Sequence, residues 1–124
     1  MLLDASALLA YLHQEQGGSQ IKALLPIAFM STVNWCEVVQ KLHAKSIDEE
    51  SVFEKLTILG LRFIPFSLEH ADKAGELWQM TSPFGLSLGD RACLATALCE
   101  NRSVVTADQR WQKLPLPLEI KLIR

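Results

Sequence analysis

The sequence is short of the residues that hold very small secreted domains together. It has three cysteines, Cys36, Cys93 and Cys99, with no C-x-x-C pair and no even number that would indicate a disulfide framework. Cys93 and Cys99 lie in an apolar helical stretch, where a free thiol behaves as a small hydrophobic side chain. We therefore expect reduced cysteines and a cytoplasmic protein.

Histidine pairs and long apolar runs are also missing. The histidines His13, His43 and His70 are scattered along the chain, so a zinc site is not expected. No segment approaches the roughly 18 apolar residues of a membrane span, and the first residues do not form a secretory signal pattern. The sequence thus predicts a protein that does not enter a membrane.

Neither sign of charge dominates. The chain has 12 basic and 14 acidic residues, a net charge of -2 and 21% charged residues, which excludes a histone-like polycation and a disordered polyelectrolyte. Its 124 residues, 49% of them hydrophobic, suffice for one buried core. A single domain over residues 1–124 is expected.

Short β-rich runs alternate with longer runs of helical period. Strands are predicted at residues 2–4, 28–30, 62–65, 103–106 and 119–122, and helices at 5–14, 19–25, 32–45, 49–59, 68–81, 88–101 and 107–113. This alternation is typical of an α/β fold in which helices cover both faces of a mostly parallel five-stranded sheet. In the helix over 68–81, the residues predicted to face the sheet are Leu68, Ala71, Gly75 and Trp78.

Four acidic residues fall near the carboxyl ends of predicted strands. Asp4 ends the first strand in LLDAS, and Glu37 lies in the helix after the second strand, in STVNWCEV. Asp108 follows the fourth strand in VVTADQRW, and Asp90 opens the helix that leads into that strand, in SLGDRACLATA. Because loops at the carboxyl ends of parallel strands form the ligand crevice of such sheets, we expect these acids to converge there.

Asp4 and Glu37 also have structural interpretations. Asp4 could cap the helix that follows it, and Glu37 precedes Lys41 by four residues, the order that favours a surface ion pair. However, Asp4 adjoins Leu2 and Leu3 in a strand that should be buried. An unpaired carboxylate there costs several kcal/mol, and a neighbouring cation would remove that cost.

Asp90 and Asp108 have structural interpretations too. Ser87 and Asp90 have the spacing of a capping box, and Asp108 follows Thr106 at a plausible helix start. Asp90 nevertheless heads the apolar column of its helix that continues through Cys93, so its side chain should point inward rather than toward bulk water. Capping and binding a cation are compatible roles for such a residue.

The ligand types at this edge favour a hard divalent cation. Carboxylate oxygens suit Mg²⁺ or Mn²⁺, and Mg²⁺ is commonly shared with substrate phosphates. Such an ion polarises a phosphate and activates water, and many nucleases hold a second ion roughly 3.5–4 Å away. With the four acids set aside, ten acidic residues remain against 12 basic ones, which favours binding of a polyanion.

Basic residues near the proposed edge are candidates for binding RNA. The candidates are Lys41, Arg91 and Arg110. Lys45 and Arg102 are better explained by ordinary solubility. Trp111 could stack on a base, but packing of the last helix against the sheet explains it more simply.

The four acid-bearing segments resemble a known family. LLDASALLAYL at 2–12, STVNWCEV at 31–38, GLSLGDRACLATA at 85–97 and VVTADQRW at 104–111 resemble, in order and spacing, the four motifs of PIN domains, specifically the small VapC-type ribonuclease toxins of type II toxin–antitoxin systems. The resemblance implies a Rossmann-like, three-layer α/β/α fold with the sheet order 3-2-1-4-5.

The resemblance also implies a site and an activity. The family's acidic, metal-holding positions match Asp4, Glu37, Asp90 and Asp108, and the positions that support the metal or its waters match Ser6 and Thr106. The resemblance implies cleavage of RNA with Mg²⁺ or Mn²⁺, a homodimer, and inhibition by a VapB-like antitoxin, often through a basic side chain that reaches the acidic pocket.

Two alternatives remain at this stage. A PIN-fold module without catalytic activity would use the acidic pocket only to bind a partner's basic segment. A phospho-receiver would need an aspartate at the end of a middle strand, whereas the third strand here ends in FIPFS without an acid.

Overall fold

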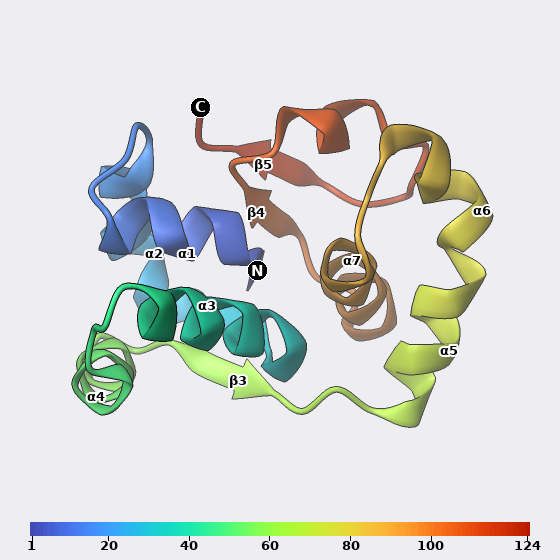
Figure 1. Ribbon diagram of the computed structural model, residues 1–124. Coiled ribbons are helices and arrows are strands. Elements are labelled where there is room, and N and C mark those ends of the chain that lie inside the picture. Colours follow the sequence, from blue (N-terminus) through green and yellow to red (C-terminus); the bar gives the residue numbers. More distant parts are fainter.

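In the computed structural model, which describes residues 1–124, five parallel strands form one sheet in the order β3-β2-β1-β4-β5 (Figure 1). The strands are β1 (Leu2–Leu3), β2 (Phe29–Ser31), β3 (Arg62–Ile64), β4 (Val104–Thr106) and β5 (Ile120–Leu122). Leu2 pairs with Phe29 on one side and with Val104 on the other. The order confirms the predicted topology and puts β1 at the centre of the sheet.

Seven α-helices and four 3₁₀ helices connect the strands. The α-helices are α1 (Ala5–Leu12), α2 (Ile21–Leu24), α3 (Thr32–Ala44), α4 (Glu49–Ile58), α5 (Leu68–Glu76), α6 (Trp78–Thr81) and α7 (Leu88–Glu100). The 3₁₀ helices are η1 (Gly18–Gln20), η2 (Leu25–Ile27), η3 (Ser82–Phe84) and η4 (Gln109–Lys113). The helix predicted over 107–113 is therefore the short η4, and the one predicted over 19–25 is divided among η1, α2 and η2.

Alternating side chains of the central strands enter two separate cores. Leu3 and Val105 face a cluster formed with α1 to α4, whereas Leu2 and Val104 face a cluster formed with α5, α7 and η4. Figure 1 accordingly shows α1, α3 and α4 on one side of the sheet and α5 to α7 on the other. This arrangement is the expected three-layer α/β/α architecture. None of the helices has the length and apolar content that a membrane crossing requires.

The predicted inner face of the segment 68–81 is wrong. The segment divides into α5 and α6 at Leu77, and Leu68 and Trp78 are 79% and 55% exposed. His70, Ala74 and Leu77 are buried instead, at the spacing i, i+4, i+7 of one helix face. The buried face of this helix contains a histidine, so a prediction based on apolar residues alone assigned the wrong face.

Two hydrogen-bonded partners make the burial of His70 tolerable. Ser67 N donates to His70 Nδ1 (3.1 Å), and His70 N donates to Ser67 Oγ (3.2 Å), so the two residues form a capping box at the start of α5. His70 Nε2 lies 3.1 Å from Glu100 Oε1 at the end of α7. A polar ring satisfied in this way can be buried at little cost.

Candidate active site

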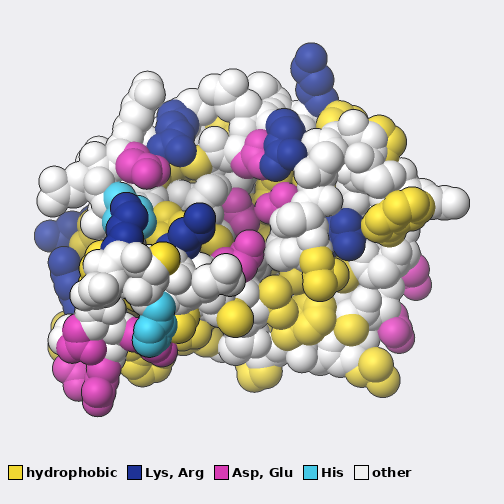
Figure 2. All heavy atoms as spheres, viewed as in Figure 1, with side chains coloured by type: hydrophobic (Ala, Val, Ile, Leu, Met, Phe, Trp, Pro, Cys, Tyr) yellow, Lys and Arg dark blue, Asp and Glu magenta, His cyan; other side chains and the backbone are white.

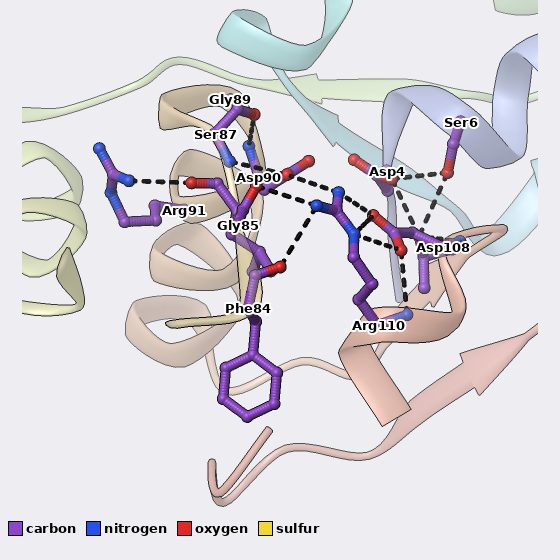
Figure 3. A network of polar contacts seen from close by, with 12 residues as sticks. Asp4, Ser6, Phe84, Gly85, Ser87, Gly89, Asp90, Arg91, Asp108 and Arg110 are labelled. Carbon is purple, nitrogen blue, oxygen red and sulfur yellow. Dashed lines mark hydrogen bonds and ion pairs between the residues drawn. The ribbon is translucent and has the colours of Figure 1, made fainter. Parts of the chain in front are cut away.

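Asp4 lies at the end of the central strand and is buried, with 3% of its surface exposed. It occupies the N-cap position of α1, yet its carboxylate caps no backbone amide. Oδ2 instead accepts hydrogen bonds from Ser6 Oγ (2.6 Å) and Thr106 Oγ1 (2.9 Å). The capping interpretation is therefore wrong, and two hydroxyls from different elements hold the carboxylate in place (Figure 3).

The charge of Asp4 is expensive in this position. The pKa of Asp4 is raised from 3.8 to about 6, chiefly by burial and also by the charges of Asp90 and Glu37, even though the hydrogen bonds from Ser6 and Thr106 lower it. Neighbouring acids raise a pKa only when they are close enough to repel the ionised form. Asp4, Glu37 and Asp90 therefore lie close enough at this edge of the sheet for their charges to repel one another.

Glu37 projects from α3 and is held against the start of α7. Asn34, fully buried one turn earlier, donates from Nδ2 to Glu37 Oε1 (2.8 Å) and to the carbonyl of Gly89 (3.0 Å). A Cβ atom on Gly89 would lie 2.6 Å from the carboxylate carbon and both carboxylate oxygens of Glu37. Burial and the charge of Asp90 raise the pKa of Glu37, whereas the Asn34 bond and Lys41 lower it.

Asp90 forms the predicted capping box at the start of α7. Ser87 N donates to Asp90 Oδ2 (2.9 Å), and Asp90 N donates to Ser87 Oγ (3.2 Å). These two bonds fix the first turn of the helix. They also orient the Asp90 carboxylate, whose side chain is 15% exposed, toward the other acids.

Asp108 caps η4 and is paired with a cation of the same turn. Its Oδ1 accepts from Arg110 N (3.0 Å), and Arg110 Nη2 lies 2.6 Å from Oδ2. Arg110 lowers the pKa of Asp108 through these contacts. The same guanidinium donates from Nη1 to the carbonyl of Gly85 (2.9 Å) and reaches Asp90 Oδ2 at 3.7 Å. The guanidinium of Arg110 thus lies between the carboxylates of Asp108 and Asp90 (Figure 3).

The acids share one site but are not arranged as a preformed coordination shell. The buried thiol of Cys93 has a pKa well above its usual value because of burial and because of the charges of Asp4, Asp90 and Glu37. At the same time, no three Asp, Glu, His or Cys side chains are placed to hold one metal ion together.

The structure separates the three cations predicted to bind RNA. Arg110 lies among the acids, and Lys41 lies on the exposed part of α3, where none of the chain's ion pairs joins it to Glu37. Arg91 donates from Nη1 to the carbonyl of Leu86 (3.3 Å) on the side of α7 away from Asp4 (Figure 3). Trp111 is fully buried in the second core, as expected of a packing residue.

The sequence also held a signal for two further site residues. Asn34 precedes Glu37 by three residues on one helix, a spacing at which side chains are neighbours. Gly89 stands in the first turn of α7, where a residue with no side chain permits close approach of another group. No short-range pattern predicts the contact between them, because α3 and α7 are far apart in the sequence.

The family model of the PIN domain matches residues 1–116. A toxin–antitoxin complex from Klebsiella pneumoniae contains a chain of 23% identity, with coverage of 96% of this chain and 98% of that one and a TM-score of 0.74. VapBC2 from Rickettsia felis bound to a promoter DNA fragment has 23% identity, coverage of 97% and 96%, and a TM-score of 0.70.

DNA-bound VapBC from Salmonella typhimurium is similar in fold as well. It has 15% identity, coverage of 99% of this chain and 97% of that one, and a TM-score of 0.76. No curated protein matches the chain. At these identities the likeness concerns the fold, which extends over the whole length of both chains.

Proposed function

Because the chain belongs to the PIN domain family, we propose that it is a metal-dependent endoribonuclease of the toxin type that hydrolyses RNA phosphodiesters. The observation that supports this most directly is Asp4, a carboxylate that is 3% exposed at the end of the central strand. Two further acids, Asp90 and Glu37, raise its pKa. A folded protein keeps such charges together at a cost, and a bound cation would offset that cost.

The residues fit a hard divalent cation. The ligand set offers carboxylate oxygens, which Mg²⁺ and Mn²⁺ prefer, and the site already accommodates the guanidinium of Arg110 as a positive charge. Asp4, Glu37 and Asp90 would hold the ion, and Asp108 would complete the shell or serve a second ion. A divalent cation held there would polarise the phosphodiester and make water a stronger nucleophile.

The remaining polar residues position the acids. Ser6 and Thr106 donate to Asp4, so its second oxygen is free to face the substrate side. The Asn34 amide fixes Glu37, and the Ser87 amide fixes Asp90. These bonds reduce the reorganisation needed when substrate binds, which is how orienting groups contribute to rate.

An antitoxin is the proposed partner. The solved structures compared above are toxin–antitoxin complexes, which supports a VapB-like inhibitor for this chain. Arg110 shows that the acidic site accepts a guanidinium, so an arginine of the antitoxin could bind there in the same way. We further propose a homodimer and a cytoplasmic location.

A catalytically silent interaction module is the second candidate. The pairing of Arg110 with Asp108 and its approach to Asp90 favour it, because these contacts suit an acidic pocket that binds arginine. The phospho-receiver alternative has less support. The third strand, β3, ends without an acid, and Asp4, at the end of the central strand, is 3% exposed and held by Ser6 and Thr106, which leaves it poorly accessible to a phosphodonor.

RNA cleavage by the purified chain separates these functions. We expect cleavage of a total RNA pool with Mg²⁺ or Mn²⁺, none with EDTA, and at least about a 100-fold slower rate for Asp90→Asn. Asp72→Asn, which removes an exposed acid of α5, is the control and should cut like the wild type. Tight binding of an arginine-rich peptide without cleavage of any RNA would support the silent module instead.

Arg110→Gln is expected to tighten Mn²⁺ binding about three- to tenfold. The guanidinium holds Asp108 through three contacts and lies close to Asp90, so it competes with a metal ion for both acids. Its side chain is half exposed, which keeps the gain modest, as for other solvent-screened pairs. Isothermal titration with Mn²⁺ in the absence of RNA measures the change directly.

The matched control for this change is Arg62→Gln. Arg62 stacks on Phe29 at the beginning of β3, 4.3 Å from the ring centre, at the opposite edge of the sheet from the acids. Removing this charge tests whether net charge alone alters Mn²⁺ affinity. Equal affinities for the wild type and Arg110→Gln would show that the guanidinium does not compete with the ion.

A further inference from the structure

A cleft of about 300 Å³ opens beside the acids, between α1, α3 and the end of the chain. Its polar lining residues are Ser6, His13, Glu15, Lys41, Lys45 and Arg124. We propose that this cleft binds the phosphate groups of the RNA strand adjacent to the phosphodiester that is cut. This inference rests on the proposed ribonuclease function and assigns a binding path to its substrate.

The cleft adjoins the acidic site at Ser6. Ser6 forms part of its wall, and the same hydroxyl donates to Asp4 Oδ2 at 2.6 Å. Lys41 on α3 and Lys45, the residue that caps its carboxyl end, follow Glu37 at intervals of four residues and so lie along the same helix face. Eight residues of α-helix extend about 12 Å, so the surface changes from acid to base along this face.

The charge of the cleft suits a polyanion. Lys41, Lys45 and Arg124 are its basic side chains, and Glu15, the one acid of the lining, is paired with Arg124 at 3.3 Å, so the two lysines supply the unpaired positive charge. His13 also lines the cleft, and its buried Nε2 has no hydrogen-bond partner. Figure 2 shows Lys and Arg side chains around the central acids, while hydrophobic side chains gather toward the lower right of this face.

A second cleft that reaches the acids has a different character. It has a volume of about 440 Å³, lies between the starts of α3 and α7, and shares Glu37 and Gly89 with the site. Its lining contains no lysine or arginine, and Leu88 at its rim is 66% exposed. Phosphate groups therefore favour the first cleft. A strand whose scissile bond lies at the acids can reach both.

Binding without cleavage tests the cleft. A fluorescein-labelled oligouridylate is titrated with the full chain in EDTA and followed by fluorescence anisotropy at several salt concentrations. For Lys41→Gln/Lys45→Gln we expect Kd to rise about tenfold at low salt, and the slope of log K against log salt to fall by about 0.7 for each cation removed. Arg124→Gln should lower the slope by less than about 0.7, because its guanidinium is already paired with Glu15.

The control removes two lysines elsewhere. Lys73→Gln/Lys121→Gln, on α5 and β5, carries the same net charge as the double variant of the cleft and should bind like the wild type. Equal losses in both double variants, or no loss in the cleft variant, would overturn the proposal. Weaker binding of a polyglutamate peptide alone, with unchanged oligouridylate binding, would also overturn it and assign the cleft to an acidic protein segment.

Cleavage assays distinguish failure of the phosphate-binding cleft from failure of the proposed ribonuclease function. If the wild type cuts RNA with Mn²⁺ while the cleft variants bind oligouridylate normally, the ribonuclease function is supported and the phosphate-binding role of the cleft is refuted. If no RNA is cut but oligouridylate binding depends on Lys41 and Lys45, the phosphate-binding role of the cleft is supported and the ribonuclease function is refuted.

Discussion

Asp4→Asn is expected to abolish RNA cleavage and, at the same time, to stabilise the metal-free protein at neutral pH. The asparagine retains an oxygen that accepts from Ser6 and Thr106 but removes a buried negative charge. Loss of a proposed metal-binding carboxylate should slow cleavage at least about 100-fold. Most substitutions of buried residues destabilise a protein, so a gain in stability would identify Asp4 as a residue kept for function.

The raised pKa of Asp4 determines the direction in which Asp4→Asn changes the free energy of unfolding. The pKa of Asp4 is about 6 in the folded protein, against 3.8 as its ordinary value, so the folded state holds the proton more tightly than the unfolded state. The free energy of unfolding of the wild type therefore falls as pH rises from about 4 to about 6, and the loss then stays constant. The total is about 3 kcal/mol, and Asp4→Asn should lack it.

Urea unfolding in EDTA between pH about 4 and about 8 measures the difference. The two proteins should have similar stability at the acidic end and diverge up to pH about 6, with the variant more stable. Asp72→Asn serves as the control for loss of an exposed acid. A variant that is less stable than the wild type at pH about 8, or that still cuts RNA, would contradict the role given to Asp4.

The acids could be predicted from the sequence because each belongs to a local pattern. Asp4 and Asp108 directly follow β-rich segments, and Asp90 stands three residues after the serine that caps its helix. Strand order then brings them together, since parallel strands present their carboxyl ends at one edge. The alternation of strands and helices is therefore enough to predict most of the fold and the approximate place of the acids.

The details of the site depend on contacts between distant segments. Arg110 is only a basic residue in the sequence, and its position among the acids follows from the turn that Asp108 caps and from the carbonyl of Gly85. The phase of α5 was hidden for a similar reason, because His70 is buried through its bond to Glu100, thirty residues away. Such tertiary partners override local apolar patterns.

Gly89→Ala is expected to lower cleavage and Mn²⁺ affinity about 10- to 100-fold while leaving the fold intact. The added Cβ would lie 2.6 Å from the carboxylate of Glu37, which must then leave its hydrogen bond with Asn34. The glutamate side chain can move, so the fold need not. The expected loss is the one typical of residues that orient a metal ligand.

Stability and function should change in opposite directions in this variant. Gly89 is the second residue of α7, and alanine is favoured over glycine in a helix by up to about 1 kcal/mol. Gly75→Ala in α5 is the matched control, because a Cβ at that position meets nothing within 4 Å. The control should gain stability and cut RNA at the wild-type rate.

A double-mutant cycle decides whether Gly89 acts through Glu37. In a Glu37→Asp background the shorter side chain leaves room for a Cβ atom, so Gly89→Ala should cost little further Mn²⁺ affinity. Titration with Mn²⁺ in the absence of RNA gives all four affinities. If the two substitutions instead weaken binding independently, Gly89 supports the site by some route other than the Glu37 carboxylate. The 2.6 Å approach argues against that outcome, because no real Cβ atom fits there while Glu37 keeps its bond to Asn34.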